Sequence, residues 1–178
     1  QQQEPSIRVL LTDSSWQSCY HPSVTIEQKG KEHTYTPDSQ ELQNDSLLLD
    51  GGADGIAIPS IERAQNPPVY YGTLEIKKTA QGLLIINELS LEAYLEAVVP
   101  SEMPASYEEQ ALMAQAVCAR TYAVCQIQEN SLEKYGADVD DSVNYQVYNN
   151  FPADKRTSKA VQDTKGQILC QNGEPITA

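Results

Sequence analysis

The stretch that decides the fold, residues 82–104, reads GLLIINELSLEAYLEAVVPSEMP. Its first part, residues 83–86, is a short apolar run typical of a strand. Ser90 can cap a helix, because the apolar residues that follow it recur on one helical face. Pro100 disfavours helical geometry in the residue before it, so we expect this helix to end near Val99. The chain therefore changes from strand to helix at Ser90.

The residues after this stretch predict a mainly helical segment. Residues 106–109 read Ser-Tyr-Glu-Glu, the pattern of a capping box, in which Ser106 caps a helix and Glu109 reaches back. We expect this helix to run to about Glu129. Further along, the sequence predicts a short strand at residues 145–148, a short helix at 155–162 and a hairpin at 164–177 around Asn172-Gly173.

The residues before the stretch predict mostly strands and turns. They indicate strands at residues 7–11 and 56–58, and hairpins at 23–35 and 70–86. Strands, then helices, then strands favour an α+β fold, with a helical core packed with β-hairpins and preceded by a β-rich N-terminal part. We expect residues 1–71 to form that β-rich region and residues 72–178 to form the core.

Length and charge exclude several classes of protein. The chain has 178 residues, 40% of them hydrophobic, which suits one domain with or without a small appendage. A net charge of −13 repels nucleic acid and anionic lipid, so we expect neither as a partner. No apolar run reaches the roughly 18 residues that a transmembrane segment needs.

The four cysteines form no CxxC motif. Cys118 and Cys125 lie seven residues apart on the expected long helix, which separates them by about 10 Å. A disulfide needs Cα atoms within about 7 Å, so these two are not expected to pair. A bond between Cys19 and Cys170 stays open.

Glu102 is the candidate catalytic acid. It lies between two prolines just before the long helix, so its backbone is held on both sides, as a general acid requires. The neighbouring Val98, Val99 and Met103 could exclude water and keep the carboxyl protonated. Alternatively, Glu102 only favours the N-terminus of the long helix through the helix dipole.

Two polar residues interrupt the small apolar stretch 114–123 of the long helix. A polar group on a tightly packed helix needs a partner or a cleft, and this applies to Gln115 and Arg120. Arg120 could bind sugar hydroxyls, orient Glu102 or form an internal ion pair. The residues alone leave these alternatives open.

No metal or cofactor is expected. Asp138, Asp140 and Asp141 could bind calcium, but they lack the EF-hand spacing, and a solvated loop is favoured. His21 and His33 are the only histidines, and they form no metal-binding motif.

Residues 82–104 resemble the signature of the SpoIID/LytB family, which includes stage II sporulation protein D and the amidase enhancers. Val-Val-Pro-Ser-Glu-Met-Pro at residues 98–104 is the most specific part. The similarity continues through residues 111–123, 146–148 and 164–169. It implies that residues 72–178 are a SpoIID-type core that is truncated at its C-terminus, because relatives continue with an aromatic and a Ser/Gly-rich segment. Asn149 stands where relatives usually have glycine, and the zinc ligands of some relatives are replaced.

The resemblance implies a lytic transglycosylase that cleaves peptidoglycan between N-acetylmuramic acid and N-acetylglucosamine. Glu102 would be the acid that protonates the glycosidic oxygen and then takes a proton from the sugar's 6-hydroxyl, which closes a 1,6-anhydro ring. Hydrolytic glycosidases usually need two carboxylates, whereas this reaction can use one. The residues expected at the substrate groove are Ser101, Gln115, Arg120, Gln146 and Tyr148.

Two rival functions stay open. One is a non-catalytic glycan-binding protein that enhances an amidase, and the other is a scaffold whose acidic loop binds calcium. The expected partners are peptidoglycan glycan strands and a cell-wall amidase. The expected location is the cell envelope outside the cytoplasm, either secreted or periplasmic.

Overall fold

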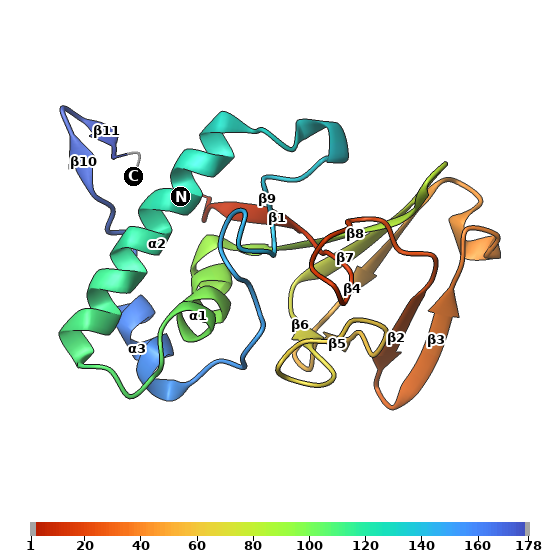
Figure 1. The fold of residues 1–178 in the computed structure, drawn as a ribbon, viewed down its shortest axis with the longest axis horizontal. Coiled ribbons are helices and arrows are strands. Elements are labelled where there is room, and N and C mark those ends of the chain that lie inside the picture. Colours follow the sequence, from red (N-terminus) through yellow and green to blue (C-terminus); the bar gives the residue numbers. More distant parts are fainter. Residues whose placement is uncertain (1–2, 177–178) are drawn as a thin grey trace.

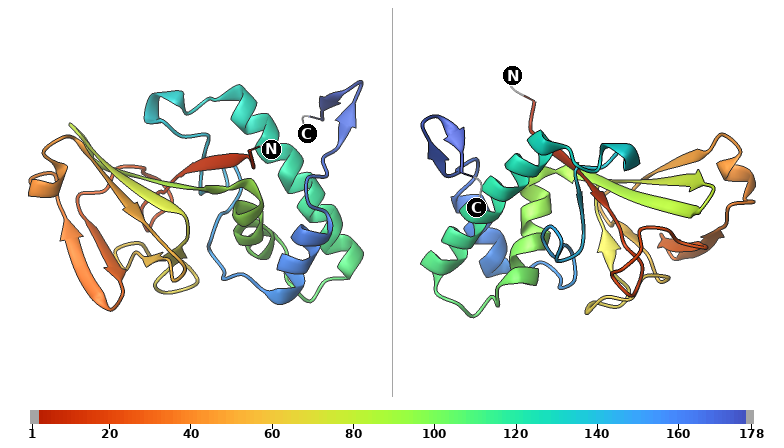
Figure 2. Two further views of the ribbon diagram at one scale, coloured as in Figure 1. Left: turned by 180° about the vertical axis from the view of Figure 1, so that it is seen from behind. Right: turned by 45° about the horizontal axis from the view of Figure 1, so that its top comes forward.

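The computed structural model describes residues 3–176, with the helices gathered at one end and a four-stranded sheet at the other (Figures 1 and 2). A five-stranded sheet of order β4-β7-β8-β1-β9 runs between them. Its pairings are antiparallel except for β1 with β9. The α+β prediction is confirmed. The strands are β1 (Ser6–Leu10), β4 (Ser46–Asp50), β7 (Thr73–Thr79), β8 (Gly82–Ser90) and β9 (Val139–Asp140).

Strand β8 is buried on both faces, which explains its continuous apolar run. Successive side chains of a strand point to opposite faces. Leu83 and Ile85 belong to the main core, whereas Leu84 and Ile86 pack in a second cluster that includes Leu10 and Ala137. Strand β8 is therefore the layer between two apolar clusters, and it leads directly into helix α1 (Leu91–Glu102).

Both N-terminal hairpins are confirmed. The first joins β2 (Val24–Gln28) to β3 (Lys31–Tyr35) through Lys29 and Gly30, which have φ values of 53° and 75°. Two successive positive φ values are typical of the tight turns that match strand twist. The second hairpin joins β7 to β8 through residues 80–81. The smaller sheet has the order β3-β2-β5-β6, with β5 (Ile56–Ala57) and β6 (Val69–Tyr70), and the 3-10 helix η1 (Gln40–Leu42) follows β3.

Helix α1 begins as predicted but ends later. The Ser90 side chain accepts a hydrogen bond from the Ala93 N–H at 3.1 Å. The predicted end near Val99 is wrong, because α1 contains Pro100 and continues to Glu102. Pro100 lacks an N–H and cannot bond the preceding turn. The following turn still closes through the Met103 N–H, which donates to the Val99 carbonyl at 2.9 Å.

Helix α2 (Glu109–Glu129) ends where predicted, but its capping box does not form. Glu108 is the N-cap and makes no side-chain capping bond, while Ser106 is exposed outside the helix. Asn130 ends the helix in the left-handed conformation. Helix α3 (Lys155–Asp163) confirms the third predicted helix, and each of the three helices contacts the other two.

The C-terminal hairpin is shorter than predicted. It consists of β10 (Cys170–Gln171) and β11 (Glu174–Pro175), joined by Asn172-Gly173 with positive φ. The predicted part at residues 164–169 is not a strand, and residue 177 lies outside the described residues. All four cysteines are free, so Cys19 and Cys170 form no disulfide.

The strand predicted at residues 145–148 is wrong. The Tyr145 N–H bonds the Ser142 carbonyl in a turn, and the Tyr148 N–H bonds the Asp141 carbonyl at 3.1 Å. These turns bend the backbone back on itself, so it cannot extend along a neighbouring strand. A second 3-10 helix, η2 (Glu133–Tyr135), precedes this segment.

The main core extends through both ends of the molecule. It includes Val24 and Ile26 from the small sheet as well as Val98 and Ala119 from the helices. The expected boundary at residue 71 therefore crosses one continuous core and stays a prediction. None of the helices within residues 3–176 has both the length and the apolar composition needed to cross a membrane.

His21 is buried against the N-terminal part of the core, and its Nε2 lies 2.9 Å from the Leu11 carbonyl. Burial lowers the pKa of His21 below its ordinary value. The unfolded chain therefore takes up a proton more readily than the folded one. The contribution of neutral His21 to the free energy of unfolding is therefore fully present above about pH 6.5. It is lost as the pH falls toward the lowered pKa of His21.

We expect the free energy of unfolding to fall by up to about 1.4 kcal/mol per pH unit just below pH 6.5 because of His21. Urea unfolding at a series of pH values measures this slope. Glutamine at position 21 can still donate to the Leu11 carbonyl but does not titrate. If the free energy of unfolding of His21→Gln fell equally steeply with pH, His21 would not be the group responsible.

Candidate active site at the end of helix α1

Glu102 is the last residue of α1, and its side chain is exposed. Its Oε1 accepts a hydrogen bond from the Val147 N–H at 2.7 Å. The expected apolar shielding is wrong, because Val98 and Val99 are fully buried in the core and Glu102 faces solvent. Glu102 lies at the carboxyl end of α1, seven residues before α2 begins, so the alternative role at the N-terminus of the long helix stays a prediction.

Ser101 fixes the same loop to α1. Its Oγ donates to the Ala97 carbonyl at 3.1 Å and accepts from the N–H groups of Asn150 and Phe151 at 3.1 and 3.2 Å. With the bond from Val147 to Glu102, two adjacent side chains hold residues 147–151 against the end of the helix. The position of the Glu102 carboxylate is therefore set by α1 and by this loop together.

A groove of about 510 Å³ opens beside Glu102, and we call it the Glu102 groove. It also contains a second carboxylate, Asp154, which sequence reasoning missed. Asp154 is the N-cap of α3, and its Oδ1 accepts from the Arg156 N–H at 2.8 Å. The groove is lined by Pro100, Ser101, Glu102, Met103, Pro104, Ala105, Phe151, Pro152 and Asp154.

Two further hollows adjoin the Glu102 groove around residues 147–154. The Tyr148 hollow, also about 510 Å³, shares Pro152 with the groove. The Trp16 hollow, about 410 Å³, contains Val147 and Asn150, whose N–H groups bond Glu102 and Ser101. Every residue from 147 to 154 lines one of these three spaces, so together they surround the loop that holds Glu102.

The structure does not bring Arg120 to Glu102. The Arg120 side chain is buried and pairs with both carboxylate oxygens of Glu92, at 2.9 and 2.8 Å. It also donates to the carbonyls of Val161 and Gln167. Glu92 lies ten residues before Glu102, which is about 15 Å along α1. Of the alternatives for Arg120, the internal ion pair is the one observed.

Replacing Arg120 with methionine is expected to lower the free energy of unfolding by about 3 kcal/mol. The change leaves Glu92 without its counter-charge and the Gln167 carbonyl without its donor, while the Val161 carbonyl still accepts from Thr164. Urea denaturation measures the loss. The matched control is Lys159→Met, which removes an exposed cation paired with Glu109 and is expected to change stability little. Equal losses in the two variants would contradict this description.

Gln146 and Tyr148 are buried in hydrogen-bond networks. Gln146 Oε1 accepts from the Tyr94 hydroxyl at 3.0 Å, and the Tyr148 hydroxyl donates to Asn87 Oδ1 at 2.5 Å. Burial raises the pKa of Tyr148 well above its ordinary value, so it remains a neutral donor. Tyr148 borders the Tyr148 hollow, whereas Gln115 and Gln146 are not among the described residues that line the three spaces.

The solvated acidic loop that the sequence favours is wrong for Asp141, whose side chain is buried. Asp141 is fully buried, and its Oδ2 accepts from Arg63 Nη2 at 2.8 Å. Its Oδ1 accepts from the Thr12 N–H and hydroxyl at 3.0 and 2.6 Å. Residues 3–176 contain no group of three or more His, Cys, Asp or Glu side chains placed to hold a metal ion. Sequence reasoning missed Arg63, since its partner is 78 residues away.

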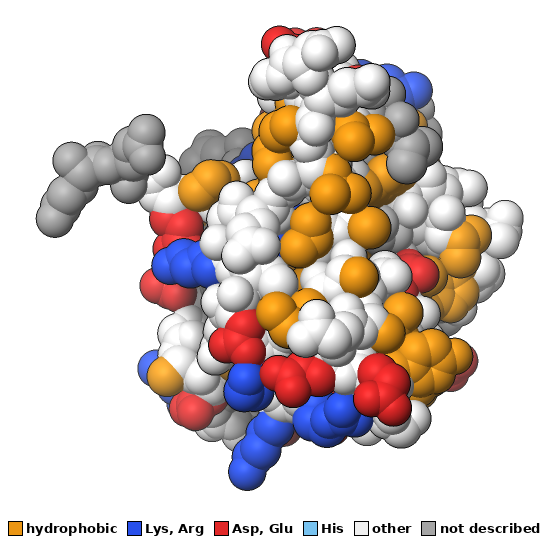
Figure 3. All heavy atoms as spheres, turned by 90° about the vertical axis from the view of Figure 1, so that its left-hand side faces the viewer, with side chains coloured by type: hydrophobic (Ala, Val, Ile, Leu, Met, Phe, Trp, Pro, Cys, Tyr) orange, Lys and Arg blue, Asp and Glu red, His pale blue; other side chains and the backbone are white. Residues whose placement is uncertain are grey.

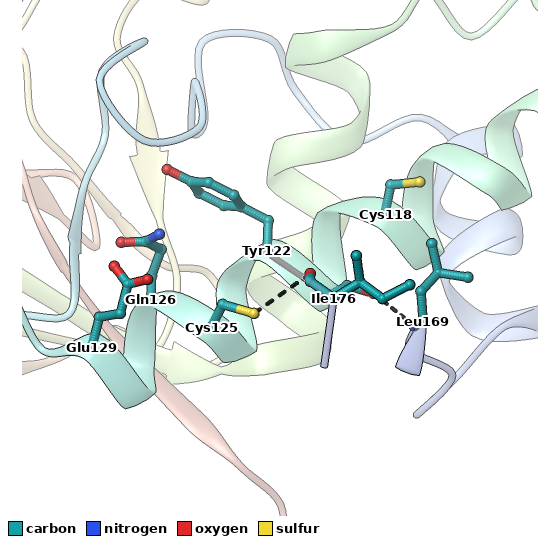
Figure 4. Close-up of a pocket in the computed structure, with 8 residues that line it drawn as sticks. Cys118, Tyr122, Cys125, Gln126, Glu129, Leu169 and Ile176 are labelled. Atoms are coloured by element: carbon teal, nitrogen blue, oxygen red, sulfur yellow. Dashed lines mark hydrogen bonds between the residues drawn. The ribbon is translucent and has the colours of Figure 1, made fainter. Parts of the chain in front are cut away.

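A separate apolar groove lies on the outer side of α2. Figure 3 shows hydrophobic side chains running down this face of the molecule, and Figure 4 shows Cys118, Tyr122 and Cys125 opposite Leu169 and Ile176. Burial raises the pKa of the Cys125 thiol. This groove of about 110 Å³ shares no lining residue with the three spaces around residues 147–154.

Comparisons with known proteins agree with the resemblance seen in the sequence. The chain is 45% identical over 84 residues to an amidase enhancer of Bacillus subtilis, covering 47% of this chain and 11% of that protein. It is 37% identical over 107 residues to stage II sporulation protein D of the same organism, covering 52% and 31%. An uncharacterised protein of Brachyspira hyodysenteriae is 36% identical over 124 residues, covering 69% and 32%.

The chain thus spans about a third or less of the length of these relatives. The model of the SpoIID family, described as stage II sporulation protein, matches residues 79–170. The match contains α1, the loop after it and the segment that surrounds Glu102. This match extends over more than half of the residues of the chain. The chain therefore belongs to the SpoIID family.

Proposed function

We propose that this chain acts on bacterial cell-wall glycan as a lytic transglycosylase, with Glu102 as both acid and base. The observation that carries the proposal is an exposed carboxylate fixed by the Val147 N–H at the edge of a groove. The names of the relatives, an amidase enhancer and a sporulation protein, support a cell-wall role. Residues 72–178 would form the catalytic core, working outside the cytoplasm where peptidoglycan lies.

The geometry suits a single acid–base group. Oε1 of Glu102 is held by the Val147 N–H, which leaves Oε2 to carry the proton. Glu102 would protonate the glycosidic oxygen as the bond to the anomeric carbon breaks. The resulting carboxylate, stabilised by the Val147 N–H, would then take the proton of the 6-hydroxyl while that oxygen bonds the anomeric carbon. The product is a 1,6-anhydro ring, and Glu102 ends protonated again.

Asp154 supports a rival reaction in the same groove. A glycosidase that uses water usually places two carboxylates about 5–10 Å apart on either side of the scissile bond. Asp154 already accepts the Arg156 N–H as the cap of α3, so it is engaged in holding the helix. We therefore propose the single-carboxylate reaction, and the chemical form of the product distinguishes the two.

The test is digestion of peptidoglycan glycan strands stripped of their peptides, followed by mass spectrometry of the new ends. Wild-type chain is expected to produce 1,6-anhydro ends, and Glu102→Gln is expected to produce none above background. Reducing ends without the anhydro ring would instead favour hydrolysis. No new ends from wild-type chain would overturn the enzymatic proposal.

The second candidate is a glycan-binding protein that enhances an amidase without cleaving glycan. Two observations favour it: the similarity to an amidase enhancer and the exposure of Glu102, which lacks an apolar shield. This function predicts that the chain binds glycan strands and raises the rate of a cell-wall amidase. Both effects would survive Glu102→Gln.

A further inference from the structure

We propose that Trp16 is the platform of a sugar-binding subsite beside Glu102, in the Trp16 hollow. This inference rests on the proposed function for the nature of the ligand, a glycan strand. The hollow combines one aromatic ring with hydroxyl and amide groups, and none of its described lining residues is charged. These residues are Ser15, Trp16, Gln17, Ser142, Val143, Asn144, Val147 and Asn150.

The Trp16 ring is held from one side by a buried cation. The guanidinium carbon of Arg63 lies 3.6 Å from the ring centroid. Arg63 is itself fixed by Asp141, and both side chains are fully buried. It also donates to the Thr12 carbonyl at 2.9 Å. The covered side of the ring is therefore rigid, and its remaining exposed part borders the hollow.

The backbone around Trp16 is held in an uncommon conformation. Trp16 has a φ of 64°, which is unfavourable for a bulky residue. Its N–H donates to the Asp13 carbonyl at 3.0 Å, and Asp13 Oδ1 accepts from both the N–H and the hydroxyl of Ser15. Strained positions of this kind are kept where the surrounding structure fixes them, and they cluster at binding sites.

The chemistry of the hollow fits an uncharged sugar. A pyranose ring presents an apolar face that can stack on an indole, and its hydroxyls can bond to the amides of Gln17 and Asn144. The net charge of −13 disfavours an anionic ligand such as nucleic acid. The neutral N-acetylglucosamine ring of a glycan strand, rather than N-acetylmuramic acid with its lactyl carboxylate, is therefore the ring that this lining favours.

The hollow lies next to the proposed acid. Val147 lines it, and the Val147 N–H bonds Glu102 Oε1. Asn150 also lines it, and its N–H bonds Ser101 Oγ. A sugar stacked on Trp16 would therefore be separated from Glu102 only by this loop. Trp16 would help to set which glycosidic bond reaches the acid. Both Trp16 and Arg63 lie outside residues 79–170, so the N-terminal part supplies the aromatic platform, while residues of the matched part such as Asn144 and Val147 complete the hollow.

The chain offers a direct probe, because Trp16 is its only tryptophan. We expect oligosaccharides of alternating N-acetylglucosamine and N-acetylmuramic acid to change its emission in a saturable way and to protect it from acrylamide quenching. Glu102→Gln is expected to respond like wild type. Trp16→Leu is expected to weaken binding at least tenfold by calorimetry. The matched control is Tyr135→Leu, which removes another partly exposed aromatic ring with a cation beside it.

Failure of the Trp16 subsite and failure of the lytic reaction at Glu102 give different results. Emission that responds to glycan in a chain that makes no anhydro ends would keep the subsite and overturn the lytic reaction. Glycan binding seen by calorimetry without any change in emission or quenching would overturn the subsite. An unchanged affinity for glycan in a folded Trp16→Leu variant would also overturn the subsite. If that variant does not fold, the wild-type titration decides.

Discussion

Glycan cleavage by Glu102→Gln is expected to be about 10²- to 10⁴-fold slower than by wild type, which is the usual contribution of a general acid–base group. The amide oxygen of glutamine can still accept the Val147 N–H bond that Glu102 accepts in the folded chain. The amide cannot donate a carboxyl proton to the glycosidic oxygen. Because the side chain is exposed, stability is expected to change little. The rate of formation of anhydro ends and the urea midpoint measure the two effects separately.

The control for this variant is Glu108→Gln. Glu108 is exposed, lies six residues further along the same connection and makes no side-chain capping bond to α2. Like Glu102→Gln, this change removes one negative charge, but Glu108 is not among the residues that line the Glu102 groove. Similar rates in the two variants would mean that Glu102 is not the acid. A parallel loss of activity and stability in Glu102→Gln would mean that its role is structural.

Replacing Asp141 with asparagine is expected to lower the free energy of unfolding by about 3–5 kcal/mol, the usual cost of leaving one charge of a buried pair alone. Burial raises the pKa of Asp141, while Arg63 and Thr12 oppose that shift. Asparagine keeps the shape and can still accept from Thr12, so the loss is mainly the unpaired guanidinium of Arg63. Urea denaturation near pH 7 measures the change.

The double variant Asp141→Leu with Arg63→Met tests the cause of that loss. It removes both charges and fills similar space with apolar atoms, so it is expected to recover the part of the loss that comes from the unpaired charge, whereas the Thr12 N–H and hydroxyl lose their acceptor. The emission of Trp16 should change in both variants, because the ring rests on Arg63. A loss below about 1 kcal/mol in Asp141→Asn, the range of an exposed pair, would contradict the burial described here.

Sequence patterns failed where distant contacts override local preference. The capping box at residues 106–109 and the strand at 145–148 both satisfy local rules. The first is replaced by a loop whose carbonyls, at Ala105 and Tyr107, are held by Arg156. The second is replaced by turns that bury Gln146 and Tyr148. In each case side-chain bonds with residues tens of positions away hold the segment, and no local pattern contains them, although the turns at 145–148 themselves close onto Asp141 and Ser142.

The sequence by itself determined the hairpins, the start of α1 at Ser90, the extent of α3 and the family, because turn chemistry, capping and motif depend on neighbouring residues. Only the tertiary structure decided that Arg120 pairs with Glu92, that Arg63 pairs with Asp141, and that Glu102 is exposed beside a groove. These depend on which distant segments pack together. The three spaces around residues 147–154 are lined by residues from the N-terminal loop, from β6 and from the ends of two helices.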